Sequence, residues 1–111
     1  MKENLPEASI HIRVWGRVQG VGFRAFVREQ AKLFNLSGWV RNVGRNQVEM
    51  RAEGRREAIE DFLVSVKKGP SVSNVRESKI EWGEFRGEFK KFKGKRSGGG
   101  EQNSVITQMF Y

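Results

Sequence analysis

The residues best suited to chemistry in this chain lie between Gly16 and Arg24, which read G-R-V-Q-G-V-G-F-R. The stretch follows an alternating apolar run, turns at its glycines and opens into a helical pattern. Several backbone N–H groups therefore converge where that helix begins, and the helix dipole favours an anion there. The guanidinium of Arg24 adds a planar set of charged donors that matches a phosphate group. The sequence thus predicts a small phosphate-binding loop.

Alternating apolar residues predict the strands that must hold this loop. The extended runs cover 10–14, 39–43, 47–53, 75–85 and, as a short last strand, 89–92. Residues 44–46 lie between the second run and the third, and their glycine and asparagine predict a hairpin turn.

Two helices are predicted from apolar residues at helical spacing, over 23–34 and around 59–66, and the second ends at Gly69-Pro70. The order is therefore β-α-β-β-α-β plus a short terminal strand. This order predicts an α+β fold, the ferredoxin-like split βαβ sandwich, with an antiparallel sheet and two helices on one face.

Length and composition limit the classes of protein that fit. The 111 residues suit one domain, and the lack of cysteine excludes disulfides, thiol catalysis and cysteine-bound metal. We expect no signal peptide or membrane span, and a cytoplasmic location. The formal net charge is +8, but half of it lies in residues 88–96, so nucleic acid is not the expected partner.

Several linked motifs resemble the acylphosphatase family. The first is G-x-V-Q-G-V-x-F-R from Gly16 to Arg24, and the second is G-W-V-x-N from Gly38 to Asn42. A V-E-x-x-x-E-G strand over 48–54 and the later Gly69-Pro70 follow in the family's order. The resemblance covers residues 8–93, the expected domain. Residues 94–111 are expected to form a basic, Gly-rich C-terminal tail. Its apolar end, residues 105–111, is expected to be frayed rather than an added strand at a sheet edge.

The resemblance implies hydrolysis of an acyl phosphate to a carboxylate and inorganic phosphate, without metal or organic cofactor. Arg24 resembles the arginine that binds the phosphoryl group, and Asn42 resembles the asparagine that orients the attacking water. The residues that resemble the family's backbone cradle are Gln19, Gly20, Val21, Gly22 and Phe23. The expected partner is a small-molecule acyl phosphate, bound by a monomer; association through the tail is the alternative.

Physical chemistry favours this substrate class independently. An acyl phosphate expels a carboxylate, whose conjugate acid has a pKa of about 4, so the leaving group needs no general acid. An alkyl phosphate would expel an alkoxide with a conjugate pKa of about 15, close to that of water. The chain has one histidine, His11, and no cysteine to assist such a reaction. The proton of the attacking water can pass to the substrate or to Arg24.

Two other functions fit parts of the sequence. A non-enzymatic module could bind RNA or another polyanion through the tail and a basic sheet face that carries Arg13, Trp15, Arg41 and Arg51. The other is a regulatory phosphate sensor that has lost turnover, and the intact Arg24 and Asn42 argue against it. The eight phenylalanines are expected in the core, rather than on an exposed surface where nucleic-acid bases could stack. His11 is expected to have a structural role.

Overall fold

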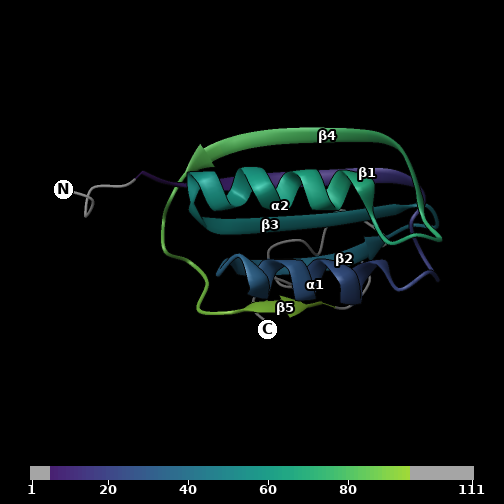
Figure 1. The fold of residues 1–111 in the computed structure, drawn as a ribbon, viewed down its shortest axis with the longest axis horizontal. Coiled ribbons are helices and arrows are strands. Elements are labelled where there is room, and N and C mark those ends of the chain that lie inside the picture. The colour runs from purple at the N-terminus through teal and green to yellow at the C-terminus, as the bar shows by residue number, and fades with distance from the viewer. Residues whose placement is uncertain (1–5, 96–111) are drawn as a thin grey trace.

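The computed structural model describes residues 6–95. Its elements follow the predicted order (Figure 1). They are β1 (Glu7–Arg17), α1 (Phe23–Leu33), β2 (Ser37–Val43), β3 (Gln47–Arg55), α2 (Arg56–Lys68), β4 (Asn74–Glu84) and β5 (Phe92–Gly94). The predicted tail lies outside the described residues from Arg96 onward.

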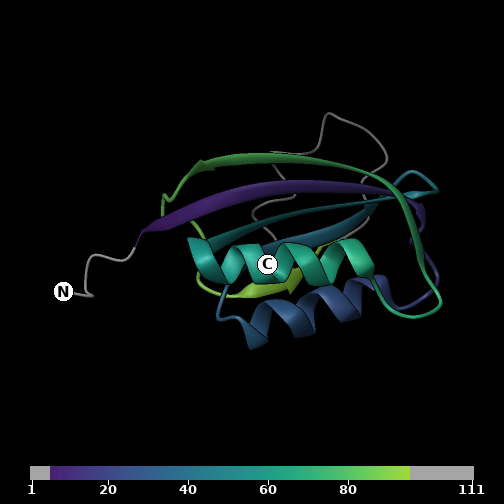
Figure 2. The same ribbon diagram turned by 45° about the horizontal axis from the view of Figure 1, so that its top comes forward.

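The strands form one sheet in the order β4-β1-β3-β2-β5. Both helices cover the same face of this sheet (Figure 2), which confirms the ferredoxin-like sandwich. The expectation of an all-antiparallel sheet holds for the first four strands and is wrong for β5, which pairs parallel to β2. The chain leaves β4 at one edge of the sheet, crosses the end where β2 begins, and so enters β5 in the direction of β2 (Figure 1).

The last strand also begins later than predicted, at Phe92 rather than at residue 89. Residues 85–91 form the crossover between the two edges, and Glu53 holds it. Glu53 is 3% exposed, and its carboxylate accepts hydrogen bonds from the backbone N–H groups of Arg86 at 2.8 Å and Glu88 at 3.0 Å. The N–H groups of residues 86 and 88 that are bonded to Glu53 cannot pair with β2, and hydrogen bonding to β2 begins at Lys91, whose carbonyl accepts from the Gly38 N–H at 2.9 Å.

The core lies between the helices and the sheet. Its largest members that are fully buried are Phe23, Phe62, Ile10, Ile12, Met50 and Ile59. Phe92 joins them, but Phe85 is 41% exposed, so the expectation that all phenylalanines are core residues is wrong at this position. Phe110 lies outside the described residues. Phe85 lies at the start of the crossover, where the chain has left the sheet and no helix covers it. No described helix has the length and apolar character needed to cross a membrane.

Candidate active site

The loop between β1 and α1 depends on two glycines. Gly20 and Gly22 have φ values of 71° and 76°, in the left-handed region that side chains with a Cβ rarely adopt. A Cβ placed on either residue would meet no atom within 4 Å. The glycines are therefore required by backbone conformation, and they leave open space above the loop rather than filling it.

The first turn of α1 is free to bind an anion. Gly22 is its N-cap, and no side chain of the described residues accepts a hydrogen bond there. The first turn carries no acidic residue, in contrast to α2, which has Glu57. Unsatisfied N–H groups and the positive end of the helix dipole together favour a negative ligand at this position.

Two arginines project from α1 beside the loop and contact β5 or the residue after it. The Nη1 atom of Arg24 donates a 3.5 Å hydrogen bond to the backbone carbonyl of Lys95. Arg28 packs against Gly94, where a Cβ would lie 2.6 Å from its Nη1 atom. The last strand therefore supports both guanidinium groups.

A cavity of about 200 Å³ brings the two sequence motifs together. Its lining residues are Val18, Gly20, Gly22, Phe23, Arg24, Ala25, Arg28 and Asn42. Asn42 reaches it from β2, because it alternates along that strand with Arg41 and so shares the helix-facing side with Val40. The cavity is smaller than the roughly 300–1,000 Å³ pockets that hold drug-sized ligands, and its size suits a phosphoryl group.

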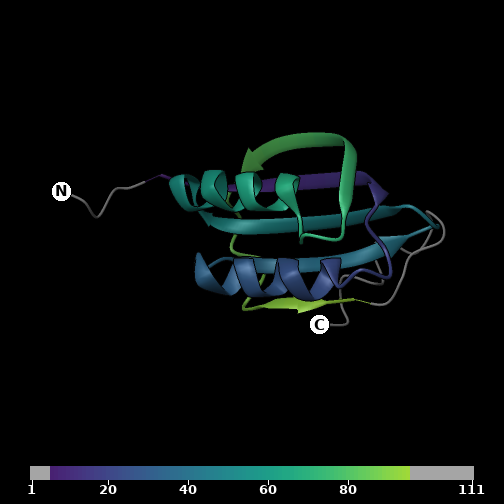
Figure 3. The same ribbon diagram turned by 45° about the vertical axis from the view of Figure 1, so that its right-hand side comes forward.

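Two of the predicted loop residues, Gln19 and Val21, do not line this cavity. The Gln19 side chain instead donates to the carbonyls of Val43 and Gly44, both at 3.2 Å, and of Gln47 at 2.9 Å. These acceptors are in the β2–β3 turn and in the strand residues that flank it, at the same end of the sheet as the loop (Figure 3). Gln19 therefore fixes the loop to the turn that follows Asn42.

Arg28 is the charged lining residue that the sequence motifs did not nominate. It lies four residues after Arg24, so both side chains share one face of α1. That spacing is visible in the sequence and was the signal available. The guanidinium of Arg28 adds a second cation to the cavity wall.

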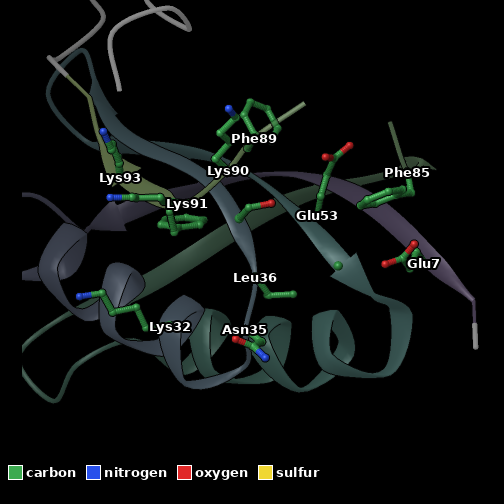
Figure 4. A pocket seen from close by; sticks show the side chains of 13 residues that line it. Glu7, Lys32, Asn35, Leu36, Glu53, Phe85, Phe89, Lys90, Lys91 and Lys93 are labelled. Carbon is green, nitrogen blue, oxygen red and sulfur yellow. The ribbon is translucent and has the colours of Figure 1, made fainter. Parts of the chain in front are cut away.

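A larger cavity of about 640 Å³ lies at the opposite end of α1 (Figure 4). Lys32, Lys91 and Lys93 lie on one side of it, and Glu7 and Phe85 on the other. It contains neither the glycine loop nor a helix N-terminus, so the smaller cavity is the better candidate. Within residues 6–95, no group of three or more histidine or acidic side chains is placed to hold a metal ion.

An ion network crosses the sheet on the face opposite the helices. Glu49 on β3 accepts from Arg41 Nε at 2.8 Å and lies 2.6 Å from the Nε2 atom of His11 on β1. Burial by itself raises the pKa of Glu49, but hydrogen bonds from His11 and Arg41 outweigh it and lower the pKa to about 2. This network gives His11 the structural environment expected for it.

Comparison with known proteins agrees with this geometry. The sequence model of the acylphosphatase family matches residues 10–94 of this chain. The chain belongs to the acylphosphatase family. An acylphosphatase of Bacillus licheniformis is 47% identical over 81 residues, which cover 73% of this chain and 90% of that protein. One from Thermus thermophilus is 46% identical over 74 residues, covering 67% and 84%.

Solved structures of family members show the same fold. The crystal structure of acylphosphatase from Bacillus subtilis superposes with a TM-score of 0.74 at 37% identity, covering 78% of this chain and 96% of that one. Full-length HypF, in its phosphate- and nucleotide-bound form, gives 0.77 at 34% identity. That match covers 89% of this chain and 13% of HypF. The fold therefore also occurs as a small part of a longer chain.

Proposed function

We propose that this chain hydrolyses acyl phosphates to a carboxylate and inorganic phosphate, through the cavity at the start of α1. The observation that carries this proposal is the convergence of Gly20, Gly22, Arg24 and Asn42 on one small cavity. Family membership and the names of the relatives support the same reaction class. The comparisons do not favour an RNA- or polyanion-binding module.

The phosphoryl group binds where α1 begins. Its oxygens accept hydrogen bonds from backbone N–H groups of the loop and from the Arg24 guanidinium, each contributing about 1.5–3 kcal/mol because the acceptor is charged. Charge on these oxygens is spread out in the loose transition state of phosphoryl transfer, so fixed donors stabilise it. Arg28 adds a cation on the same wall.

Asn42 orients the attacking water. Its side-chain oxygen accepts a hydrogen bond from the water and its NH₂ group can donate to the phosphoryl group, so it directs attack on phosphorus without acting as a base. The bond from phosphorus to the carboxyl oxygen breaks, and the carboxylate leaves with the bonding electron pair. The water proton passes to a phosphoryl oxygen, because a guanidinium is already protonated and cannot accept it.

The test is hydrolysis of benzoyl phosphate by the purified protein with a chelator present. We expect turnover that survives the chelator and falls about 10²-fold in Asn42→Ala, because the water is no longer held in line. Affinity for inorganic phosphate should change little in that variant. Asn46→Ala, in the exposed β2–β3 turn, is the matched control and should retain full activity.

Two outcomes would contradict this proposal. A folded wild-type protein without turnover would make the loop a phosphate-binding site that lacks catalysis. An equal loss of phosphate affinity in Asn42→Ala would make Asn42 a binding group instead of a water-orienting one. A cytoplasmic location and a monomeric state belong to the same proposal, to be checked by cell fractionation and by sedimentation.

A further inference from the structure

One face of α1 carries a row of three cations. Arg24, Arg28 and Lys32 follow one another at intervals of four residues, so each lies about one turn beyond the last. The helix contains one acidic residue, Glu29, which is adjacent to Arg28 in the sequence and therefore does not face it. Like charges at this spacing destabilise a helix, so the row is unfavourable for α1 unless an anion binds beside it.

The other helix has the opposite pattern. On α2, Arg56 and Glu60 form an ion pair at the same spacing, with 3.4 Å between the arginine Nε and the glutamate Oε2 atoms. By contrast, neither Arg28 nor Lys32 forms an ion pair with an acidic side chain of residues 6–95. The positive charge along α1 is therefore not compensated by a side chain in the described part of the molecule.

The row begins at the active-site cavity and continues beyond it. Its first two members line that cavity, and no acidic residue is among the described residues of the wall. The Arg28 guanidinium occupies space that Gly94 leaves by having no side chain. Lys32 lies one turn further along, at the larger cavity, on the same side as Lys91 and Lys93 (Figure 4). Positive charge therefore extends from the phosphoryl site along the helix.

The phosphoryl group does not need all three cations. In the proposed reaction, the loop N–H groups and the Arg24 guanidinium already supply its donors. At roughly 1.5 Å per residue, Arg28 lies about 6 Å from Arg24 along the helix axis, and Lys32 lies about 12 Å from it. A second anionic group on the acyl part of the substrate would also lie several ångströms from phosphorus, so its position matches this offset.

We propose that this row selects acyl phosphates whose acyl part carries a further carboxylate, and that Arg28 binds that carboxylate. The inference rests on the proposed hydrolysis of acyl phosphates and narrows its substrate class. The planar guanidinium of Arg28 matches a carboxylate in a two-point contact, and Lys32 adds attraction for longer acyl groups. Arg28 is then a specificity residue that binds the leaving group and takes no part in the attack on phosphorus.

The experiment compares two substrates of similar shape that differ by one negative charge, 4-carboxybenzoyl phosphate and 4-carbamoylbenzoyl phosphate. After correction for uncatalysed hydrolysis, we expect the wild-type kcat/KM to be about tenfold higher for the carboxylate, as for one charge-assisted contact. Arg28→Gln should remove this preference and keep turnover of the carbamoyl substrate. Arg28→Lys should keep part of the preference, because the charge remains, and added salt should weaken it in the wild-type protein.

Lys67→Gln is the matched control, because it removes the same charge from the last turn of α2, outside both cavities, and should leave the ratio unchanged. Equal kcat/KM for the two substrates in the wild-type protein overturns the proposal and leaves the hydrolysis itself intact. So does an equal loss for both substrates in Arg28→Gln, because Arg28 then acts on the phosphoryl group. Turnover of neither substrate contradicts the proposed reaction as well. Should Arg28→Gln fail to fold, a wild-type preference that does not fall with salt overturns the proposal.

Discussion

Arg24 and Arg28 lie one helical turn apart on the wall of the same cavity, but their surroundings differ. Arg24 belongs to the first turn of α1 and bonds the Lys95 carbonyl, whereas Arg28 lies deeper along the helix against Gly94. A planar, bidentate donor set is needed only where phosphoryl oxygens are bound. We therefore assign that role to Arg24 and a supporting electrostatic role to Arg28.

Substitution by lysine separates these roles, because lysine keeps the charge and loses the planar fork. We expect Arg24→Lys to lower kcat/KM for benzoyl phosphate by about 10²-fold or more, in the range for loss of a transition-state donor. Arg28→Lys should lower it far less. Steady-state kinetics on both variants checks this, and similar losses at the two positions would mean that the guanidinium groups act as a pair.

Gly22 and Gly44 offer a second matched pair of single residues. Both have positive φ, 76° and 61°, and a Cβ on either would meet no atom within 4 Å. Replacing either glycine by alanine should therefore lower the free energy of unfolding by a similar amount, roughly 1–2 kcal/mol. Only Gly22→Ala should also weaken binding of inorganic phosphate, because Gly22 lines the cavity and Gly44 does not.

Denaturant titration and phosphate-binding calorimetry on the two alanine variants separate these effects. A loss of phosphate affinity in Gly44→Ala equal to that in Gly22→Ala would show that general loosening of the loop and its neighbouring turn explains the effect. A loss of phosphate affinity confined to Gly22→Ala would show that the loop before α1 itself binds the phosphate.

At the scale of elements, the shortest strand has the widest influence. β5 contains three residues, yet it or Lys95 just after it contacts Arg24 and Arg28. The crossover that delivers it is fixed by one buried side chain, Glu53. We therefore expect the geometry of the cavity to depend on a carboxylate at the opposite end of the sheet.

Removing that carboxylate should affect stability and catalysis together. We expect Glu53→Ala to lower the free energy of unfolding by about 3 kcal/mol, because two backbone N–H groups lose the buried, charged acceptor that they share. It should also lower kcat/KM by loosening β5 beneath the arginines. Glu60→Ala, which removes an exposed ion pair with Arg56, is the control and should cost about 0.5 kcal/mol or less. Unchanged kinetics in a destabilised Glu53→Ala protein would uncouple the crossover from the site.

The network that joins β1, β2 and β3 predicts a loss of stability in acid. The pKa of Glu49 is about 2 in the folded protein and 4.5 as its ordinary value, so the unfolded state binds the proton more readily. The stabilisation, about 3 kcal/mol at roughly 1.4 kcal/mol per unit, is present above pH 4.5 and is lost as the pH falls towards 2. Urea unfolding across this range should show the decline, and Glu49→Gln should flatten it.

For the whole molecule, the sequence predicted the parts that follow from local rules. Alternation predicted four strands, helical spacing predicted both helices, and Gly20 and Gly22 marked the turn before α1. What it missed depends on contacts between distant residues. The crossover before β5 is bonded to Glu53, more than thirty residues earlier, and the hydrogen bonds of Gln19 reach the turn beyond α1 and the strand ends beside it.

The exposure of Phe85 follows the same rule, since it reflects where the crossover leaves the sheet. Arg28 is a different case, because its spacing from Arg24 was visible, but only the packing of α1 beside β5 shows which face the cavity uses. Motif order therefore predicted the reaction class, while the supporting contacts required the folded chain.

The strand order also determines how quickly this chain can fold. The interior strand β1 has no neighbour in the sheet that is adjacent to it in the sequence: Ile10 pairs with Ala52 on one side and with Trp82 on the other. Both pairings close long loops before any contact compensates the lost entropy, which slows folding. Stopped-flow refolding should therefore take milliseconds to seconds, roughly, rather than the microseconds of helical bundles. Because the cavity needs the loop after β1, the end of β2 and the late β5, activity should return no earlier than the slowest of these pairings.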